Sequence, residues 1–109
     1  MIMEKDVCCV GRKKFLVGFK LAGVKRCYEL GDEEKMCEGL KEKLEDLIND
    51  DSVGLIIVEE KCFNMLEERD REKYESLPMP IVLPLGKKIG ASETLRRKIM
   101  ETIGIDLFR

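Results

Sequence analysis

The residues that could carry chemistry in this sequence are cysteines and a few charged side chains, because the chain contains no histidine. Without histidine, neither a Ser–His nor a Cys–His nucleophile can form. A zinc site would need cysteine and carboxylate ligands, and no C-x-x-C pair is present to start one. We therefore expect no metal, and we interpret the cysteines as reduced, mostly buried thiols that pack like small hydrophobic residues. They are Cys8, Cys9, Cys27, Cys37 and Cys62.

Glycines stand beside basic residues at two places, and neither place matches a phosphate-binding loop. Residues 11–18 read G-R-K-K-F-L-V-G, whereas a dinucleotide-binding fingerprint needs G-x-G-x-x-G. Residues 86–92 read G-K-K-I-G-A-S, and their lysines precede the second glycine, unlike those of a Walker loop. Arg12 and Lys13 also stand where a receiver domain would need acidic residues to hold magnesium. We therefore expect no catalytic residue and no bound cofactor.

Strand-like and helix-like segments alternate along the whole chain and would have to position any site. Four β–α units in series predict a parallel sheet with helices on both faces. The right-handed crossover rule and the common strand order then give 2-1-3-4. We predict an α/β three-layer sandwich, Rossmann-like or receiver-like, as one domain over residues 1–103 with a tail over 104–109. The expected strands are 6–11, 24–30, 52–58 and 80–85, and the expected helices are 13–23, 32–48, 62–75 and 92–103.

The apolar positions of these helices indicate which side faces the sheet. In helix 32–48, which Asp32 is expected to cap, they form one stripe: Met36, Cys37, Leu40, Leu44, Leu47 and Ile48. In helix 13–23, Phe15, Phe19 and Ala22 share the face expected to pack on the sheet. Val17 and Leu21 then lie on the opposite side of this helix. Exposed apolar residues of this kind indicate a protein-binding patch, unless helix 92–103 or the tail covers them.

The two faces of the predicted sandwich differ in charge. Residues 12–26 hold six basic residues and no acidic one, and residues 87–98 hold five basic residues against Glu93 alone. Residues 32–51 hold nine acidic residues and three lysines. Since helices 13–23 and 92–103 share one face, we expect that face to be basic and the opposite face to be acidic.

The crevice beyond the first and third strands would be lined by Gly11, Arg12, Glu59 and Glu60. We interpret the two glutamates there as charges that favour the start of the next helix.

Composition and charge exclude several classes of protein. The formal net charge of −2 gives no overall attraction to nucleic acid or to an anionic membrane. Three charged residues within the first ten break any signal-peptide core, and the longest apolar run, near residues 53–58, is far shorter than the roughly 18–20 residues of a membrane span. We expect a cytoplasmic protein without a membrane-inserted segment.

Four segments of the chain resemble one known family. Residues 17–24, V-G-F-K-L-A-G-V, are similar to the G-F-R-L-A-G-V segment of the F subunit of archaeal and bacterial V-type (A-type) ATP synthases. Residues 53–60 (V-G-L-I-I-V-E-E), 80–87 (P-I-V-L-P-L-G-K) and 103–107 (I-G-I-D-L) are similar to its third strand, fourth strand and C-terminal signature. The chain departs from the family at 11–14, where G-R-K-K replaces an acidic turn.

This resemblance implies a non-catalytic subunit of the rotary central stalk. Such a subunit would bind the D subunit, contact the ring of A and B subunits, and couple ATP synthesis or hydrolysis to ion transport. It would lie on the cytoplasmic side of the membrane through the complex. The alternatives are a receiver-like domain that binds a small ligand or regulates, and a nucleic-acid-binding module that uses the basic face. The partner-binding residues that we predict are Val17, Gly18, Phe19, Lys20, Leu21, Ile103, Gly104, Ile105, Asp106 and Leu107.

Overall fold

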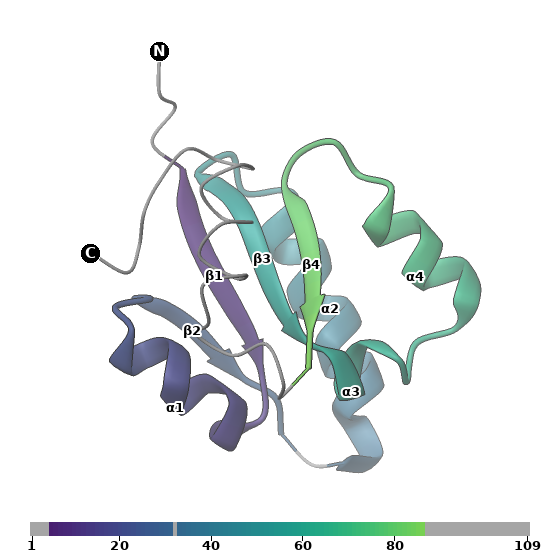
Figure 1. Ribbon diagram of the computed structural model, residues 1–109. Helices are drawn as coiled ribbons and strands as arrows, with labels where there is room; N and C mark the ends of the chain where they lie inside the picture. The colour runs from purple at the N-terminus through teal and green to yellow at the C-terminus, as the bar shows by residue number, and fades with distance from the viewer. Residues whose placement is uncertain (1–4, 32, 87–109) are drawn as a thin grey trace.

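The computed structural model describes residues 5–31 and 33–86, and within them it contains one four-stranded sheet (Figure 1). The strands lie in the order β2-β1-β3-β4, and every neighbouring pair is parallel. The predicted α/β fold and strand order are therefore confirmed. The strands are β1 (Asp6–Gly11), β2 (Arg26–Glu29), β3 (Val53–Glu59) and β4 (Ile81–Leu85).

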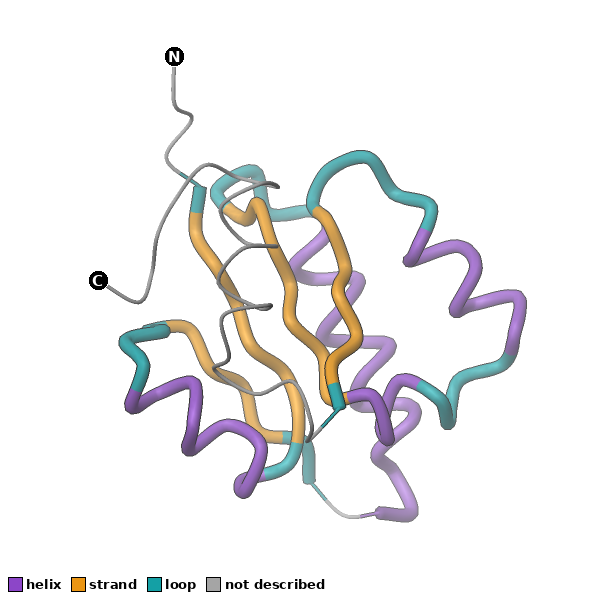
Figure 2. The backbone as a smooth tube through the Cα atoms, viewed as in Figure 1, coloured by secondary structure: helices purple, strands orange, loops and turns teal. Residues whose placement is uncertain are grey.

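Helices connect these strands on both faces of the sheet (Figure 2). The helix α1 lies on one face, while α2 lies behind the sheet in the view of Figure 1. The predicted helix over 92–103 and the tail over 104–109 lie outside the described residues. The helical elements are α1 (Lys13–Leu21), the 3-10 turn η1 (Glu33–Lys35), α2 (Met36–Ile48), α3 (Glu60–Phe63) and α4 (Glu68–Glu75).

Alternation of side chains along the central strands divides the core into two clusters. In β3, Leu55 and Ile57 pack with α1, whereas Ile56 and Val58 pack with α2, α3 and α4. Successive residues of a strand point to opposite faces, so a strand that is covered on both sides must be apolar throughout. Every residue of β3 is buried, which agrees with the apolar run over residues 53–58, and Glu59 at the end of the strand is the exception in chemical character.

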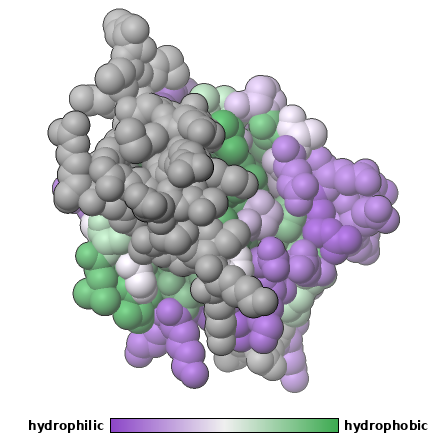
Figure 3. Space-filling view, viewed as in Figure 1, coloured by the Kyte–Doolittle hydropathy of each residue, from purple (hydrophilic) through white to green (hydrophobic). Residues whose placement is uncertain are grey.

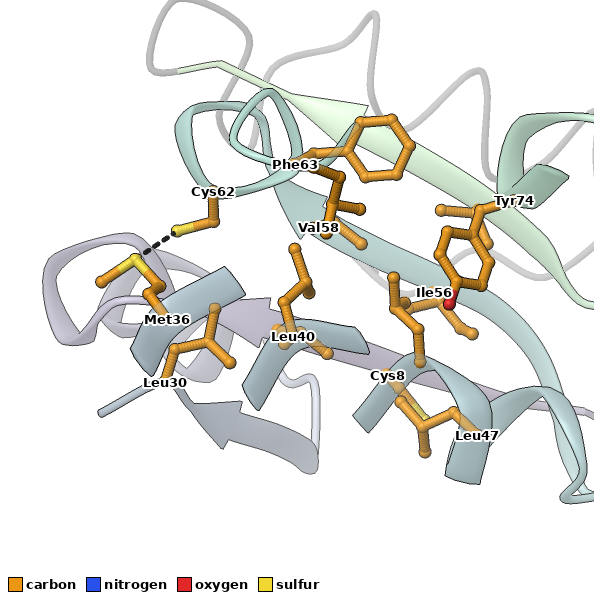
Figure 4. Close-up of a cluster of buried hydrophobic side chains, with 14 of the residues drawn as sticks. Cys8, Leu30, Met36, Leu40, Leu47, Ile56, Val58, Cys62, Phe63 and Tyr74 are labelled. Carbon is orange, nitrogen blue, oxygen red and sulfur yellow. Dashed lines mark hydrogen bonds between the residues drawn. The ribbon is translucent and has the colours of Figure 1, made fainter. Parts of the chain in front are cut away.

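The larger cluster lies between the sheet and the helix α2 (Figure 4). The predicted apolar stripe of α2 is confirmed, because four of its residues are buried and Cys37 and Ile48 pack at its margin. The helix α4 joins this cluster mainly through Tyr74, whose hydroxyl donates a hydrogen bond of 2.8 Å to Glu45 Oε1 of α2. The buried stripe residues of α2 are Met36, Leu40, Leu44 and Leu47.

The prediction of one helix over residues 62–75 was wrong, because the chain breaks between α3 and α4. The turn at the break leaves backbone carbonyls without helical partners, and the guanidinium of Arg71 donates to two of them, Asn64 O at 3.0 Å and Leu66 O at 2.8 Å. Phe63 before the break and Tyr74 after it are both buried.

Three smaller differences concern element ends. The strand β2 is shorter than the predicted 24–30, although Val24 and Leu30, which flank it, are both buried. The helix α2 is preceded by the 3-10 turn η1 and begins at Met36, while the predicted cap, Asp32, lies outside the described residues. In α1 the buried positions are Leu16 and Phe19, so Leu16 belongs to the core face that we had assigned to Phe15, Phe19 and Ala22.

Candidate functional site

The candidate site is the outward face of α1, which the sheet side of the same helix holds in place. Leu16 and Phe19 are buried against β1 and β3, and the Phe15 and Phe19 rings lie with centroids 4.9 Å apart. The helix ends at Leu21, and Gly23 in the turn that follows has a φ of 105°, in the left-handed region that favours glycine. The position of α1 on the sheet is therefore fixed by packing at its middle and by a glycine turn at its end.

Two apolar side chains on the other side of α1 are exposed. Val17 is 47% exposed and Leu21 is 84% exposed, and they stand four positions apart, so they lie on one face of the helix. Figure 3 shows this hydrophobic area over α1, at the left of the view, next to hydrophilic residues. The prediction that these two residues point away from the sheet is confirmed. Helix 92–103 and the tail, named above as the alternative cover for this pair, lie outside the described residues.

Lysines surround this apolar pair. Lys13, Lys14 and Lys20 are exposed on α1, and the helix carries no acidic residue. Gly18 lies between Val17 and Phe19, and a Cβ atom placed on it would meet nothing within 4 Å, so the surface there is open. The outward face of α1 therefore combines apolar contact area with positive charge. We call Lys13, Lys14, Val17, Gly18, Lys20 and Leu21 the α1 surface.

Not all of the predicted partner-binding residues belong to this surface. Phe19 is buried, and its side chain is part of the core that supports α1, so only its backbone lies near the surface. Ile103, Gly104, Ile105, Asp106 and Leu107 lie outside the described residues. Val17, Gly18, Lys20 and Leu21 are brought together on the exposed side.

A partly buried ion pair lies at the carboxyl ends of the two central strands. Glu59, at the end of β3, is 5% exposed and is the one charged residue that is buried among those described. Its Oε1 accepts hydrogen bonds from the backbone N–H of Arg12 at 2.9 Å and from Arg12 Nε at 3.0 Å. The guanidinium also binds Oε2, so the contact is bidentate. Arg12 stands immediately before α1, and the pair therefore ties the start of α1 to the end of β3.

This geometry adds a second role to our interpretation of Glu59. The residue stands at the N-terminal end of α3, where its charge was expected to favour the helix, but its side chain makes no capping hydrogen bond and binds Arg12. Burial alone would raise the pKa of Glu59, but the hydrogen bonds and the charge of Arg12 outweigh it and hold that pKa below its usual value. Both residues had been placed at the same crevice, yet nothing in the sequence showed that they pair.

The positive charge of the basic segment 12–26 is also reduced by pairing. Arg26 binds Asp6 at 3.0 Å and Asp50 at 3.0 Å, at the opposite end of the sheet from Glu59. A hydrogen bond to Tyr28 and these contacts raise the pKa of Arg26 further above its usual range. The two arginines of the segment are thus bound within the domain, and the exposed positive charge comes from its lysines, including Lys25.

A hollow of about 300 Å³ lies beside the Arg12–Glu59 pair. It corresponds in position to the predicted crevice, but Arg12 is the one residue that the prediction and the lining share. The remaining walls come from the start of α2 and from the segment after β3, which the sequence analysis had not brought together. The residues that line the hollow are Arg12, Met36, Lys61, Cys62 and Met65.

All five cysteines lie among the described residues and all are free thiols. Cys8, Cys9 and Cys62 are buried, and Cys27 and Cys37 are partly exposed, which confirms the interpretation of mostly buried thiols. Burial raises the pKa of Cys8 to about 11, and burial together with the nearby Glu59 raises that of Cys62 to about 12.

Within residues 5–31 and 33–86, no three cysteine, aspartate or glutamate side chains are grouped as metal ligands would be. In the same part of the chain, no helix has the length and apolar character of a membrane span.

Comparisons with known proteins agree on one family. Residues 7–103 match the family model described as ATP synthase (F/14-kDa) subunit. The F subunit of the A-type ATP synthase of Methanococcoides burtonii is 34% identical over 104 residues, which cover 95% of this chain and 99% of that protein. The corresponding protein of Haloquadratum walsbyi is 36% identical over 105 residues, covering 96% and 94%. A crystal structure of the F subunit of the V-type ATP synthase from Archaeoglobus fulgidus shares the fold, with a TM-score of 0.59 and 24% identity over 77% of this chain and all of that one.

Proposed function

The chain belongs to the ATP synthase (F/14-kDa) subunit family, and from this premise we propose that it is a non-catalytic subunit of the central stalk. In this role it binds the D subunit and contacts the A–B catalytic ring of a V/A-type ATP synthase. It turns with the stalk, and the catalytic ring carries out the ATP chemistry. It lies on the cytoplasmic side of the membrane through its contacts with the complex.

The observation that supports this proposal most is the exposure of Val17 and Leu21 on a helix rich in lysine. Complete burial of a fully exposed apolar side chain contributes about 1.5–3 kcal/mol of hydrophobic free energy. Most of the surface of Leu21 is exposed in the free chain and is available for such a contact. The neighbouring lysines favour an acidic partner and one orientation of docking. A long stalk helix with acidic residues beside an apolar seam fits this α1 surface.

Rigidity of the domain supports the same role. A subunit that transmits torque needs a binding helix that keeps its angle under load. The helix α1 is held at its start by the Arg12–Glu59 pair and at its middle by Leu16 and Phe19 in the core. These contacts suit α1 to transmit force rather than to change shape.

Affinity purification of the tagged chain from its own cells tests the proposal. We expect the D, A and B subunits to purify with it in fixed ratio, and mass spectrometry identifies and quantifies them. The isolated chain should show no ATPase activity that follows the protein peak through a final size-exclusion step. Recovery of the chain without any of these proteins, from cells that contain the assembled complex, would contradict the proposal.

A further inference from the structure

The hollow beside the Arg12–Glu59 pair lies where the strand order reverses. Arg12 follows β1, and Lys61 and Cys62 follow the neighbouring strand β3, while the connections from these two strands run to opposite sides of the sheet. In open parallel sheets, this position at the carboxyl ends of the strands is where loops part and binding sites form. The location therefore favours a binding role for the hollow independently of its size.

The hollow is lined by sulfur-containing apolar side chains and by a positively charged lysine. Cys62 Sγ lies 3.3 Å from Met36 Sδ, and both residues are buried (Figure 4). Met65 is 50% exposed and forms a wall that is open to solvent. Lys61 is exposed, and the described lining contains no carboxylate. Methionine side chains adapt to the shape of an apolar guest because they are unbranched and flexible.

We propose that this hollow is a second docking point for the partner that binds the α1 surface, and that it receives an apolar side chain from an acidic segment of that partner. The proposal rests on the proposed function. A volume of about 300 Å³ is at the small end of ligand pockets, which suits a side chain better than a cofactor. Lys61 at the hollow and Lys13 and Lys14 on the adjoining turn of α1 supply charge that an acidic segment would balance.

Continuity with the α1 surface identifies the partner as the same one. Arg12 is both a wall of the hollow and the residue that precedes α1, so the hollow adjoins the start of the α1 surface. The charge of Arg12 itself is held by Glu59, so attraction for the acidic segment comes from the lysines. The partner thus gains a fixed register, with one contact on the exposed helix face and one at the carboxyl end of the sheet.

Oxidation of methionines tests this contact without any substitution. Met65 and Met79 are 50% and 45% exposed in the free chain, so dilute peroxide should oxidise both at similar rates. In the complex with the recombinant D subunit or with the A–B ring, we expect oxidation of Met65 to slow several-fold and that of Met79 to stay unchanged. Equal rates for Met65 in the free and fully bound chain would overturn the inference. Slowing that depends on the concentration of the free chain would assign the hollow to a second copy and would overturn it as well.

Paired variants separate this inference from the proposed function. We expect Met65→Asp and Lys61→Glu each to weaken binding by at least tenfold in calorimetric titrations, because both place a negative charge against the acidic segment, while Met79→Asp, which changes a similarly exposed methionine elsewhere, has no effect. Circular dichroism and thermal unfolding should be alike for all three variants. If the wild-type chain binds neither the D subunit nor the A–B ring, the proposed function fails. If the wild type binds and Met65→Asp binds equally well, the inference about the hollow fails and the proposed function stands.

Discussion

The side chains of Arg12 and Glu59 meet between the two central strands, although they stand 47 residues apart in the sequence. The carboxylate accepts bonds from both the guanidinium and the backbone N–H of Arg12, so it fixes the turn as well as the side chain. An ion pair with one buried partner adds little net stability over an apolar pair, but removing Glu59 leaves the charge of Arg12 unbalanced. Its main effect is to specify one geometry for the turn between β1 and α1.

Substitution of Glu59 by glutamine should therefore destabilise the domain. The amide keeps the size of the side chain but cannot balance the charge of Arg12. Its NH₂ group would also face an N–H donor of Arg12 in place of an acceptor oxygen. We expect the free energy of unfolding to fall by about 2 kcal/mol, less than for a fully buried pair, because Arg12 retains some access to water. Urea denaturation followed by circular dichroism measures the change. The control Glu60→Gln alters an exposed neighbour and should shift the value by less than about 0.5 kcal/mol.

The contribution of this pair should disappear in acid. The folded-state pKa of Glu59 is lowered, so its contribution is fully present above the unfolded pKa, near 4.3, and is lost as the pH falls through the folded pKa. The difference in unfolding free energy between wild type and Glu59→Gln should narrow progressively below about pH 4. Urea titrations at several pH values between neutral and strongly acid measure it. A difference that stays constant over this range would show that Glu59 does not titrate as its contacts require.

The double variant Val17→Asp/Leu21→Asp should fold normally and assemble poorly. Both side chains are exposed, so their loss removes no core contact, whereas a carboxylate at either position opposes an acidic partner. We expect binding to weaken by a few kcal/mol if both residues are anchors. Thermal unfolding beside pull-downs with the D subunit and with the A–B ring provides the measurement, with Met79→Asp as the matched exposed control. Normal assembly of the folded double variant would place the interface elsewhere.

The attachment of α4 should depend on Tyr74 in two separable ways. Tyr74→Phe keeps the packing but removes the hydrogen bond to Glu45, and we expect a loss of about 1 kcal/mol. Tyr74→Ala also empties a fully buried site and should cost about 3–5 kcal/mol. Denaturant unfolding compares the two variants. Equal losses would mean that the ring contributes no packing energy, in conflict with its burial.

Thiol titration should divide the cysteines into two groups. Cys27 and Cys37 are partly exposed and should react with a disulfide reagent in the folded protein, though slowly for Cys27, whose pKa burial raises. Cys8, Cys9 and Cys62 should react only after unfolding, because they are inaccessible and their thiolates are disfavoured. The expected total in denaturant without reductant is all five thiols. A lower total would reveal a disulfide in the native protein.

Features written in local sequence patterns were the ones that could be predicted. The apolar run that became β3 and the stripe of α2 are set by side-chain periodicity, and the strand order follows from general rules of connection. The exposure of Val17 and Leu21 also follows from helix periodicity alone. The assignment of the family was possible for a different reason, since it depends on matching segments rather than on physical patterns.

Features that depend on register or on distant contacts could not be predicted. The β1–β3 ladder sets Val10 beside Val58, and this register brings Arg12 within reach of Glu59. The break between α3 and α4 falls at residues 64–67, which read N-M-L-E and contain neither glycine nor proline, and its carbonyls are satisfied by Arg71 from the following helix. The hollow arises from three separate segments. None of these relationships leaves a signal in the neighbouring sequence.

The central place of β3 has a consequence for how the chain folds during synthesis. The first β–α–β unit can form one ladder as it leaves the ribosome, but β3 supplies apolar side chains to both clusters and pairs with β1 and β4 on its two edges. Closing the long loop between β1 and β3 costs chain entropy before any of these contacts repays it. The rate-limiting event should therefore come after Glu59 has emerged, and chains arrested before that point should remain sensitive to proteases.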